Sequence, residues 1–242
     1  GTDGTAFYEI KQAHVRVFQF FSALRQVRKL IKDIKPDVLH VHSVAIYGLV
    51  GALIGFHPFV ATAWGSDVLV DGKSLVKKPF VKYVLNKADL ITCDANHMVS
   101  AMKELGGDRN KVKIIYFGID TQKFHPTERN EELRKQLGIS DSPAIISMRN
   151  FYPVYDIESL IYAVPIVIKE VPDAKFIIGG SGPEEEKLKS LVKSTGISEN
   201  VRFTGRIQSD ELPKYLNSMY IYVSTALSDA GIAASTAEAM AC

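Results

Sequence analysis

Short apolar runs alternate along the chain with longer stretches in which apolar residues recur at helical spacing. The first long stretch, residues 14–34, has the periodicity of an amphipathic helix. Its apolar positions are Val17, Phe20, Phe21, Leu24, Val27 and Leu30. Pro36 then ends the helical pattern, and the run at residues 37–41 predicts a buried strand.

Seven more apolar runs predict strands, and helical patterns separate most of them. They are residues 59–62, 90–93, 112–115, 144–148, 175–178, 201–203 and 221–223. The runs are rich in Val and Ile and show no clean polar alternation, which is typical of strands covered on both faces. Alternating strands and helices predict parallel sheets with helices on both sides, so we expect an α/β fold.

The alternation is interrupted between Phe124 and Pro143, where residues 125–130 are polar and charged. One short helix is predicted there, at residues 131–137, and a new series of strands follows. This break predicts two doubly wound, Rossmann-like domains, residues 1–124 and residues 125–242.

Composition narrows the class of protein. Hydrophobic residues make up 46% of the chain and charged residues 23%, and the net charge of +2 lacks the basic excess of a nucleic-acid-binding protein. The two cysteines, Cys93 and Cys242, have no CxxC partner, so we expect free thiols in a reducing compartment and no zinc site. No apolar run reaches the length of a membrane span, and the first residues do not resemble a signal peptide. We therefore expect a cytoplasmic protein.

Ligands of a doubly wound sheet bind beyond the carboxyl ends of its strands. In the first half, Gly65, Ser66 and Asp67 follow such an end. They predict either hydrogen bonds to ligand hydroxyls or a helix cap. Gly118 follows another predicted strand, after residues 112–115, and its glycine predicts a turn, either in a linker or in a cleft between the domains.

In the second half, Arg149 follows the strand at residues 144–148. A guanidinium there suits a diphosphate, and a surface ion pair is the alternative. Gly180 and Ser181 belong to a glycine-rich turn before a helix, which resembles a phosphate-binding turn but lacks the third glycine of GxGxxG.

The last segment, residues 224–242, predicts a strand end, a loop of small residues and a helix. Small residues at a helix start expose backbone N–H groups to an anion. Glu238 lies inside this helix beside an apolar run, and its carboxylate could accept hydrogen bonds from both hydroxyls of a ribose. The alternative is an exposed helical glutamate.

Several of these motifs, in this order, resemble the family-four, or group 1, glycosyltransferases. Residues 118–124 resemble the segment between the two domains of that family, and residues 144–149 resemble its strand ending in arginine. The runs at residues 171–183 and 201–206, followed by the segment ending at Cys242, are similar to its second domain. The resemblance extends from about Pro36 to Cys242.

The resemblance implies a GT-B fold, with two Rossmann-like domains facing across a cleft. It implies a retaining hexosyltransferase that moves a sugar from a nucleotide diphosphate sugar to a hydroxyl acceptor. By this resemblance Arg149 would contact the diphosphate, Glu238 the ribose, and Gly180 and Ser181 the surroundings of the base. Asp67, with Gly65 and Ser66, would face the donor sugar and the acceptor.

The resemblance also implies that the loop from Ser228 to Ser235 surrounds the donor sugar and phosphates. Its donor-binding members would be Asp229, Ala230, Gly231, Ile232 and Ala233. Gly118 would belong to the same site. The sequence contains no Asp-x-Asp triplet, which favours a metal-independent enzyme that has no cofactor besides the sugar nucleotide.

Three positions depart from the family pattern. Tyr155 stands near the usual place of a lysine, Ala230 stands where the first glutamate of a Glu-x7-Glu pair is common, and Trp64 replaces a frequent histidine. Compared with the family, the chain also lacks the first strand and ends inside the donor-binding helix. A GT-B sugar-nucleotide epimerase and a non-catalytic sugar-nucleotide-binding protein therefore remain alternatives.

Residues 73–87 carry five lysines among apolar residues that include Phe80, Val81, Val84 and Leu85. One interpretation is a solvated helix face. The other is peripheral contact with an anionic membrane, which would place the protein at the inner face of the membrane beside a lipid-linked acceptor. No nucleic-acid partner is expected.

Overall fold

The computed structural model describes residues 6, 8, 9 and 16–242, and the chain divides into two compact units, Gly1–Phe117 and Gly118–Cys242. Helix α1 (Arg16–Ile34) accounts for the first predicted helix. His14 and the side chain of Val17 lie outside the described part of the chain, as do most of the first residues, on which the expectation of a missing strand depends.

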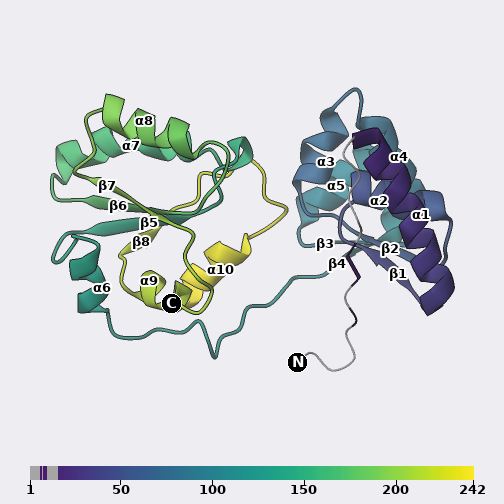
Figure 1. Cartoon of the computed structure of the whole chain (residues 1–242), viewed down its shortest axis with the longest axis horizontal. Coiled ribbons are helices and arrows are strands. Elements are labelled where there is room, and N and C mark those ends of the chain that lie inside the picture. The colour runs from purple at the N-terminus through teal and green to yellow at the C-terminus, as the bar shows by residue number, and fades with distance from the viewer. Residues whose placement is uncertain (1–5, 7, 10–15) are drawn as a thin grey trace. The chain divides into compact units, whose positions relative to one another are not determined.

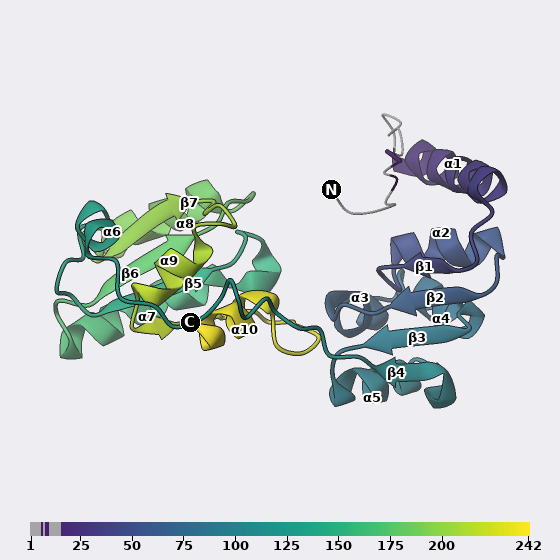
Figure 2. The same ribbon diagram turned by 90° about the horizontal axis from the view of Figure 1, so that it is seen from below.

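The first unit is a parallel sheet with helices against it (Figures 1 and 2). Its strands, in spatial order, are β1 (Leu39–Val41), β2 (Phe59–Thr62), β3 (Leu90–Cys93) and β4 (Val112–Ile114). Besides α1, its helices are α2 (Ile46–Ile54), α3 (Ser66–Leu69), α4 (Lys78–Lys87) and α5 (Asn96–Glu104), with the 3-10 turns η1 (Asp71–Lys73) and η2 (Arg109–Lys111). Helix α2 packs against both α1 and α4.

The second unit is a separate parallel sheet in the order β7-β6-β5-β8. Its strands are β5 (Ala144–Met148), β6 (Lys175–Gly179), β7 (Val201–Gly205) and β8 (Ile221–Tyr222). Its helices are α6 (Glu131–Gln136), α7 (Ile157–Glu170), α8 (Glu185–Ser194), α9 (Leu212–Asn217) and α10 (Ala234–Ala241), with the turn η3 (Pro153–Tyr155). Figure 1 shows α7 and α8 on one face of this sheet and α6, α9 and α10 on the other.

The predicted strands are confirmed, each with its ends within two residues of the expected positions. Burial on both faces explains why their sequences show no polar alternation. In β5 and β6, Ile145 and Phe176 point into the core on the α7–α8 side, whereas Ile146 and Ile177 point into the core on the opposite side. A strand buried on both faces has no solvent side that would require polar residues.

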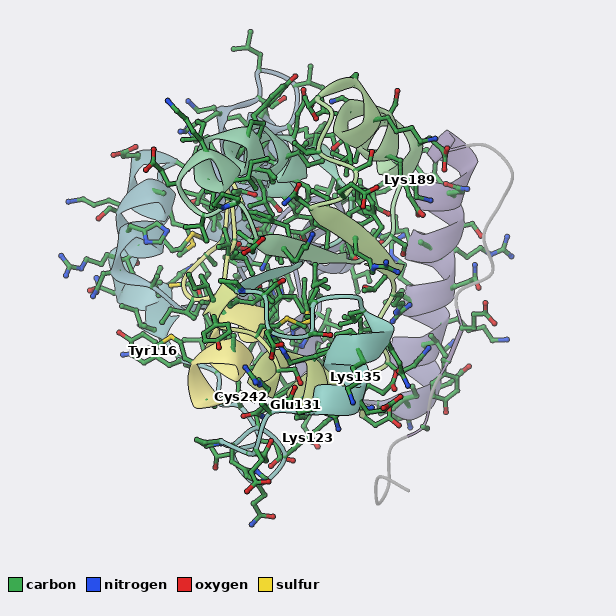
Figure 3. The ribbon with its side chains drawn as sticks, turned by 90° about the vertical axis from the view of Figure 1, so that its left-hand side faces the viewer. Tyr116, Lys123, Glu131, Lys135, Lys189 and Cys242 are labelled. Carbon is green, nitrogen blue, oxygen red and sulfur yellow. The ribbon has the colours of Figure 1, made fainter. Side chains whose placement is uncertain are left out.

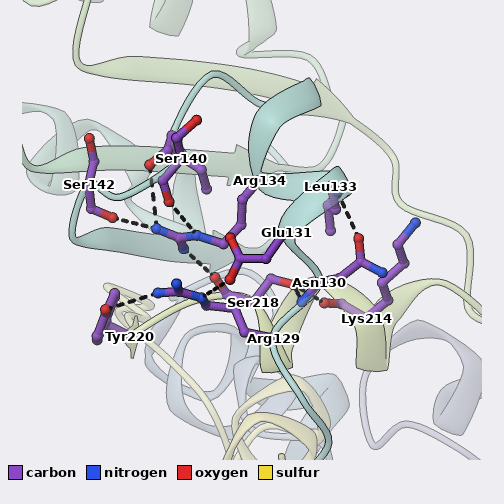
Figure 4. Close-up of polar contacts among 11 residues, drawn as sticks. Arg129, Asn130, Glu131, Leu133, Arg134, Ser140, Ser142, Lys214, Ser218 and Tyr220 are labelled. Carbon is purple, nitrogen blue, oxygen red and sulfur yellow. Dashed lines mark hydrogen bonds and ion pairs between the residues drawn. The ribbon is translucent and has the colours of Figure 1, made fainter.

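Helix α6 is anchored by Arg134, whose side chain is fully buried (Figure 4). Its guanidinium donates hydrogen bonds to main-chain carbonyls, including those of Ser140 at 2.8 Å, Ser142 at 2.6 Å and Ser218 at 2.5 Å. Burial lowers the pKa of Arg134. Because these carbonyls belong to the loop before β5 and the segment after α9, one side chain joins three parts of the second unit.

The segment between the two sheets differs from the expected one. Gly118 lies in an irregular, exposed stretch with no turn, so the turn predicted at this glycine is wrong. The chain turns instead at residues 120–124, where the Asp120 carboxylate accepts hydrogen bonds from the N–H groups of Gln122 and Lys123. Phe124 is buried in the core of the second unit, and therefore the second unit includes this turn.

Candidate functional site

Arg149 lies directly after β5 and is only 9% exposed. Its Nη2 atom is 2.6 Å from Oδ1 of Asp229, and its Nη1 atom is 3.4 Å from Oγ of Ser235. The guanidinium also stacks over the ring of Tyr155, 4.3 Å from the ring centre. Contacts on the edge and on one face fix the orientation of this cation, and a fixed cation suits recognition of an anion.

A cavity of about 310 Å³ adjoins Arg149. It is formed by the segments that follow β5, β6 and β7, together with the start of α10. Its lining residues are Met148, Arg149, Asn150, Tyr155, Gly179, Gly180, Arg206, Ile207, Leu212, Ala234 and Ser235. The cavity therefore lies at the carboxyl edge of the sheet, where ligands of doubly wound domains bind.

The start of α10 lines this cavity through Ala234 and Ser235. Its N-cap residue, Ala233, is extended and provides no side-chain cap. The first N–H groups of a helix lack intrahelical partners and carry the positive end of the helix dipole. Arg149 and the start of α10 thus place two sources of positive potential at one cavity, an arrangement suited to a phosphate or diphosphate.

The glycine-rich turn after β6 packs on the segment after β5. Gly180 has φ +148°, and a Cβ atom there would lie 2.3 Å from the carbonyl oxygen of Arg149. The N–H of Phe151 donates to the carbonyl of Ser181 at 3.0 Å. Gly180 lines the cavity and Ser181 is exposed. The close approach that requires glycine at position 180 is therefore to Arg149 of this chain.

The loop before α10 brings Asp229 to Arg149 across 80 positions of sequence. In this loop Ala230 is buried, with 5% of its surface exposed, and Ile232 is largely exposed. Gly231 and Ala233 have intermediate exposure. The Oγ atom of Ser228 is buried and has no hydrogen-bond partner among the described residues. A buried unpaired hydroxyl costs free energy unless another group satisfies it, so this loop has unused hydrogen-bonding capacity.

Glu238 lies on α10 one turn beyond Ser235 and does not line the cavity. Burial raises the pKa of its carboxyl group, and the charge of Lys123 opposes this rise. Figure 3 labels Lys123 and also Cys242, the thiol on which the charge of Glu238 acts. Ser235, three positions before Glu238 on α10, contacts Arg149 directly.

Tyr155 and Arg206 are among the cavity residues that were not identified as site residues from the sequence. Tyr155, noted only as the replacement of a lysine, stacks on Arg149, and Arg206 follows β7 and lines the same cavity. Arg206 is exposed and could meet a second part of an anion. The rule that located Arg149, a basic residue directly after a strand, also applies to Arg206, but the strand was predicted to end at residue 203.

In the first unit, Asp67 is 6% exposed, and both of its carboxylate oxygens accept backbone hydrogen bonds. Oδ2 accepts from the N–H of Val44 at 2.8 Å, and Oδ1 accepts from the N–H of Trp64 at 3.0 Å. Burial raises the pKa of Asp67, although these hydrogen bonds oppose the rise. Asp67 therefore ties the segment after β1 to the segment after β2, rather than capping α3.

Gly65 and Ser66 complete this segment. Gly65 has φ +103°, a left-handed conformation that favours glycine, and it precedes α3, which begins at Ser66. The Ser66 carbonyl accepts a hydrogen bond from the N–H of Val70. The tight bend at Gly65 brings Asp67 back to the N–H of Trp64.

An aromatic row lies at the same edge of the first sheet. The rings of His40 and His42 are 4.3 Å apart, and His42 stacks on Trp64 at 5.9 Å. Nε2 of His40 and Oγ1 of Thr62 are 2.7 Å apart. Burial and the neighbouring His42 lower the pKa of His40. The sequence predicted a strand here but gave no reason to single out these histidines.

Within the described residues, no group of three or more His, Cys, Asp or Glu side chains is arranged to hold a metal ion. In the same part of the chain, no helix combines the length and the apolar composition needed to span a membrane. Cys93 is buried and Cys242 is partly exposed, and both are free.

Curated relatives are similar to the chain over most of its length. It is 26% identical to N-acetyl-alpha-D-glucosaminyl L-malate synthase of Bacillus anthracis, covering 83% of this chain and 55% of the relative. It is 30% identical to a GDP-mannose-dependent monoacylated alpha-(1-6)-phosphatidylinositol monomannoside mannosyltransferase of Corynebacterium glutamicum. That match covers 73% of this chain and 46% of the relative. The chain thus spans about half the length of the curated relatives it matches.

Solved structures share the fold. HepE of Anabaena in complex with UDP-glucose matches with a TM-score of 0.76 at 20% identity, over 90% of this chain and 60% of that one. Sucrose-phosphate synthase of Thermosynechococcus elongatus matches with a TM-score of 0.79 at 17% identity, over 95% and 61%. The predicted GT-B class of fold is confirmed.

Each of the two units carries one family match. Residues 1–95 match the family described as "Glycosyl transferase 4-like", and residues 129–242 match the family "Glycosyl transferases group 1". The two matches cover both units in the order expected from the sequence motifs. The chain belongs to the family-four glycosyltransferases.

Proposed function

We propose that the protein to which this chain belongs is a retaining hexosyltransferase, which transfers a sugar from a nucleotide diphosphate sugar to a hydroxyl acceptor. The observation that carries this proposal is the oriented Arg149 guanidinium at a cavity that also receives the start of α10. In the transfer, the bond between C1 of the sugar and the diphosphate oxygen breaks. A bond from C1 to the acceptor oxygen forms with the same configuration, and the acceptor proton leaves with the nucleoside diphosphate.

Negative charge grows on the diphosphate as the sugar departs. A prearranged cation and helix N–H groups stabilise that charge without having to reorganise during the reaction. Arg149 is held in place by Asp229, Ser235 and Tyr155 before any ligand arrives, which supports this role. We propose Arg206, which lines the same cavity, as a second cation.

The remaining donor contacts follow the family pattern. We propose that Glu238 binds the ribose hydroxyls, that Gly180 and Ser181 lie near the base, and that residues 229–233 adjoin the sugar. The unpaired hydroxyl of Ser228 supports a polar ligand beside this loop. Gly118 stays a predicted member of the donor site. For Asp67, with Gly65 and Ser66, the hydrogen bonds to Val44 and Trp64 support a positioning role.

The donor base is proposed from the relatives. HepE was solved with UDP-glucose, and the Corynebacterium relative is named as dependent on GDP-mannose. Binding of UDP, GDP and ADP to the purified protein, measured by calorimetry, should select one base.

Addition of EDTA should leave turnover unchanged if the protein cations alone neutralise the diphosphate. Loss of turnover on metal removal would contradict metal independence.

The central test is Arg149→Ala, matched by Arg129→Ala as control. Both arginines form a 2.6 Å ion pair in the second unit, but Arg129 is paired with Glu131 outside the cavity. We expect Arg149→Ala to weaken binding of the nucleoside diphosphate at least tenfold, since hydrogen bonds to charged groups contribute roughly 1.5–3 kcal/mol. Equal affinities in both variants, with unchanged circular dichroism, would reject the site.

Products distinguish transfer from the alternatives. A transferase releases the nucleoside diphosphate and needs an acceptor, whereas an epimerase converts the sugar nucleotide without one. A non-catalytic binding protein would bind the donor and leave it unchanged. The names of the curated relatives, which are synthases and transferases, favour transfer.

We propose a lipid-linked acceptor at the inner face of the membrane, with peripheral contact by a cytoplasmic protein. Besides the phosphatidylinositol mannoside transferase, the chain is 25% identical to the alpha-monoglucosyldiacylglycerol synthase of Streptococcus pneumoniae. Transfer of labelled sugar to extracted lipids, compared with transfer to free sugars and malate, tests this proposal. Exclusive labelling of a water-soluble acceptor would contradict it.

A further inference from the structure

In the lysine-rich segment of residues 73–87, most of the apolar residues predicted to contact a membrane are buried, and other apolar residues are exposed. Val81, Val84 and Leu85 are completely buried beneath α4, so they cannot contact an external partner. Phe80, at 46% exposed, is the accessible apolar residue of that predicted set. The inner face of α4 is thus used by the core of the first unit.

The exposed apolar residues lie just before α4. Leu75 is 93% exposed and Val76 is 74% exposed, and no other large hydrophobic side chain among the described residues is as exposed as Leu75. They form the end of the loop between η1 and α4, which we name the Leu75–Val76 tip. Two adjacent large apolar side chains in water mark a contact surface more strongly than single exposed residues do.

The backbone holds the tip away from the core. At its base Gly72 is buried, and a Cβ atom there would lie 2.7 Å from Leu105. The N–H of Lys78 donates to the carbonyl of Ser74 at 2.9 Å, and Nζ of Lys77 is 2.7 Å from Asp71. These contacts close the loop on both sides of Leu75 and Val76, so the two side chains cannot fold back onto the protein without breaking them.

The charge around the tip is mainly positive, and the one acidic residue at its base, Asp71, is paired with Lys77. Residues 72–88 contain five lysines and no acidic residue, and Lys73 and Lys78 flank the tip closely. Lys82 and Lys87 continue along the exposed face of α4, where Lys87 lies over the ring of Tyr83 at 5.8 Å. An apolar end surrounded by lysines and bordered by Phe80 and Tyr83 matches the boundary between acyl chains and anionic headgroups.

We propose that the Leu75–Val76 tip inserts into an anionic lipid bilayer, with Lys73 and Lys78 at the phosphate level. The tip follows α3, which begins at the carboxyl end of β2 next to Gly65 and Asp67. Insertion would therefore hold the membrane beside the ligand-binding edge of the first sheet. This insertion would provide the membrane contact of the proposed function, on which it rests. Its test measures lipid binding without a sugar donor. Failure to bind lipid would therefore leave sugar transfer untouched, and loss of sugar transfer would leave lipid binding untouched.

The test is sedimentation of the purified chain with phosphatidylcholine vesicles that contain phosphatidylglycerol, at low ionic strength. We expect binding to these vesicles, and weak binding to vesicles of phosphatidylcholine alone. The double variant Leu75→Ser/Val76→Ser should lose roughly tenfold or more in partition constant, because each side chain loses its apolar burial. Lys73→Gln/Lys78→Gln should lose a similar factor, since each lysine near an anionic surface contributes roughly fivefold.

Ile166→Ser is the matched control, because Ile166 lies in the second unit, outside the lysine-rich segment, and is 71% exposed. It should bind like the unaltered chain. A Leu75→Trp variant adds a direct reading, since its fluorescence should shift to the blue and be quenched by brominated lipid. Unchanged sedimentation of both double variants, or failure of the unaltered chain to bind anionic vesicles, would overturn the proposal.

A second copy of the chain, or another protein, is the competing occupant of the tip. Light scattering of the unaltered chain and of Leu75→Ser/Val76→Ser distinguishes these occupants from lipid. We expect the same molar mass for both in the absence of vesicles. A larger mass that the double variant abolishes would overturn membrane insertion and assign the tip to self-association.

Discussion

At the residue scale, Asp67 combines a buried carboxylate with hydrogen bonds to the N–H groups of Val44 and Trp64. Asp67→Asn keeps the shape but replaces one accepting oxygen by a donating amide, which leaves one N–H without a partner. We expect a loss of about 1–3 kcal/mol in the free energy of unfolding of the first unit. Denaturation followed by fluorescence of Trp64, the single tryptophan, measures it.

Asp71→Asn is the control, because Asp71 forms an exposed pair with Lys77, and such pairs contribute less than about 1 kcal/mol. Equal losses in the two variants would contradict the structural role of Asp67.

The pH dependence of Asp67 has a defined sign. Burial raises its pKa in the folded chain, so the folded state holds the proton more tightly than the unfolded state. Stability contributed by this group is fully present below the ordinary aspartate pKa of about 3.9 and falls as pH rises through the raised value. The stability advantage of the unaltered chain over Asp67→Asn should therefore shrink as pH rises from about 4. Urea titrations of both proteins across this range check it, and a growing advantage would contradict it.

Arg206 provides a second residue-scale prediction. Arg206→Gln should weaken binding of a nucleoside diphosphate about tenfold. This is near the lower end of what a hydrogen bond to a charged group contributes to binding, because Arg206 is exposed. Binding of the corresponding monophosphate should change little if the cation meets the terminal phosphate. Calorimetry with both nucleotides measures the difference. Arg202→Gln, an exposed arginine of β7 that does not line the cavity, should change neither, and equal weakening for both nucleotides would place Arg206 elsewhere.

At the element scale, α6 depends on Arg134. Arg134→Met keeps the stem but leaves the carbonyls of residues such as Ser140, Ser142 and Ser218 without their donor. Since each buried unpaired carbonyl costs roughly 1–3 kcal/mol, we expect a loss of about 3 kcal/mol or more in the stability of the second unit. Denaturation followed by far-ultraviolet circular dichroism measures it.

Arg129→Met is the neighbouring control, because the contacts of Arg129 with Glu131 and Tyr220 are exposed and its loss should cost much less stability than the loss of Arg134. A loss no larger for Arg134→Met than for Arg129→Met would show that water satisfies the freed carbonyls.

The strands could be predicted from the sequence, whereas the side-chain contacts of the candidate site could not. The strands were found from sequence because burial on both faces produces continuous apolar runs, as in β5 and β6. The ion pair of Arg149 with Asp229 could not be found, because it joins residues 80 positions apart and depends on how two loops meet. The burial of Val81, Val84 and Leu85 could not be predicted either, since lysine spacing alone does not tell which face of a helix meets the core.

At the scale of the whole molecule, the two units have separate sheets and separate cores. A ligand that binds the second unit at about one hundred times its dissociation constant should stabilise that unit by roughly 2.7 kcal/mol. We expect the transition reported by Trp64, in the first unit, to stay unchanged, while the circular dichroism transition of the second unit moves. An equal shift of both would show that the units unfold together.

Strand β1 has further importance for the solubility of the chain. Among the described residues it pairs only with β2, so its other side offers unsatisfied backbone groups to a second molecule. The edge strands β4 and β7 carry Lys113 and Arg202, charges that discourage such pairing, whereas β8 has no charged residue and the central residue of β1 is His40. Burial and the neighbouring His42 lower the pKa of His40, so acidification below the ordinary range of histidine is needed to charge this side chain. Acidification should therefore suppress edge-to-edge aggregation, as light scattering over time would reveal.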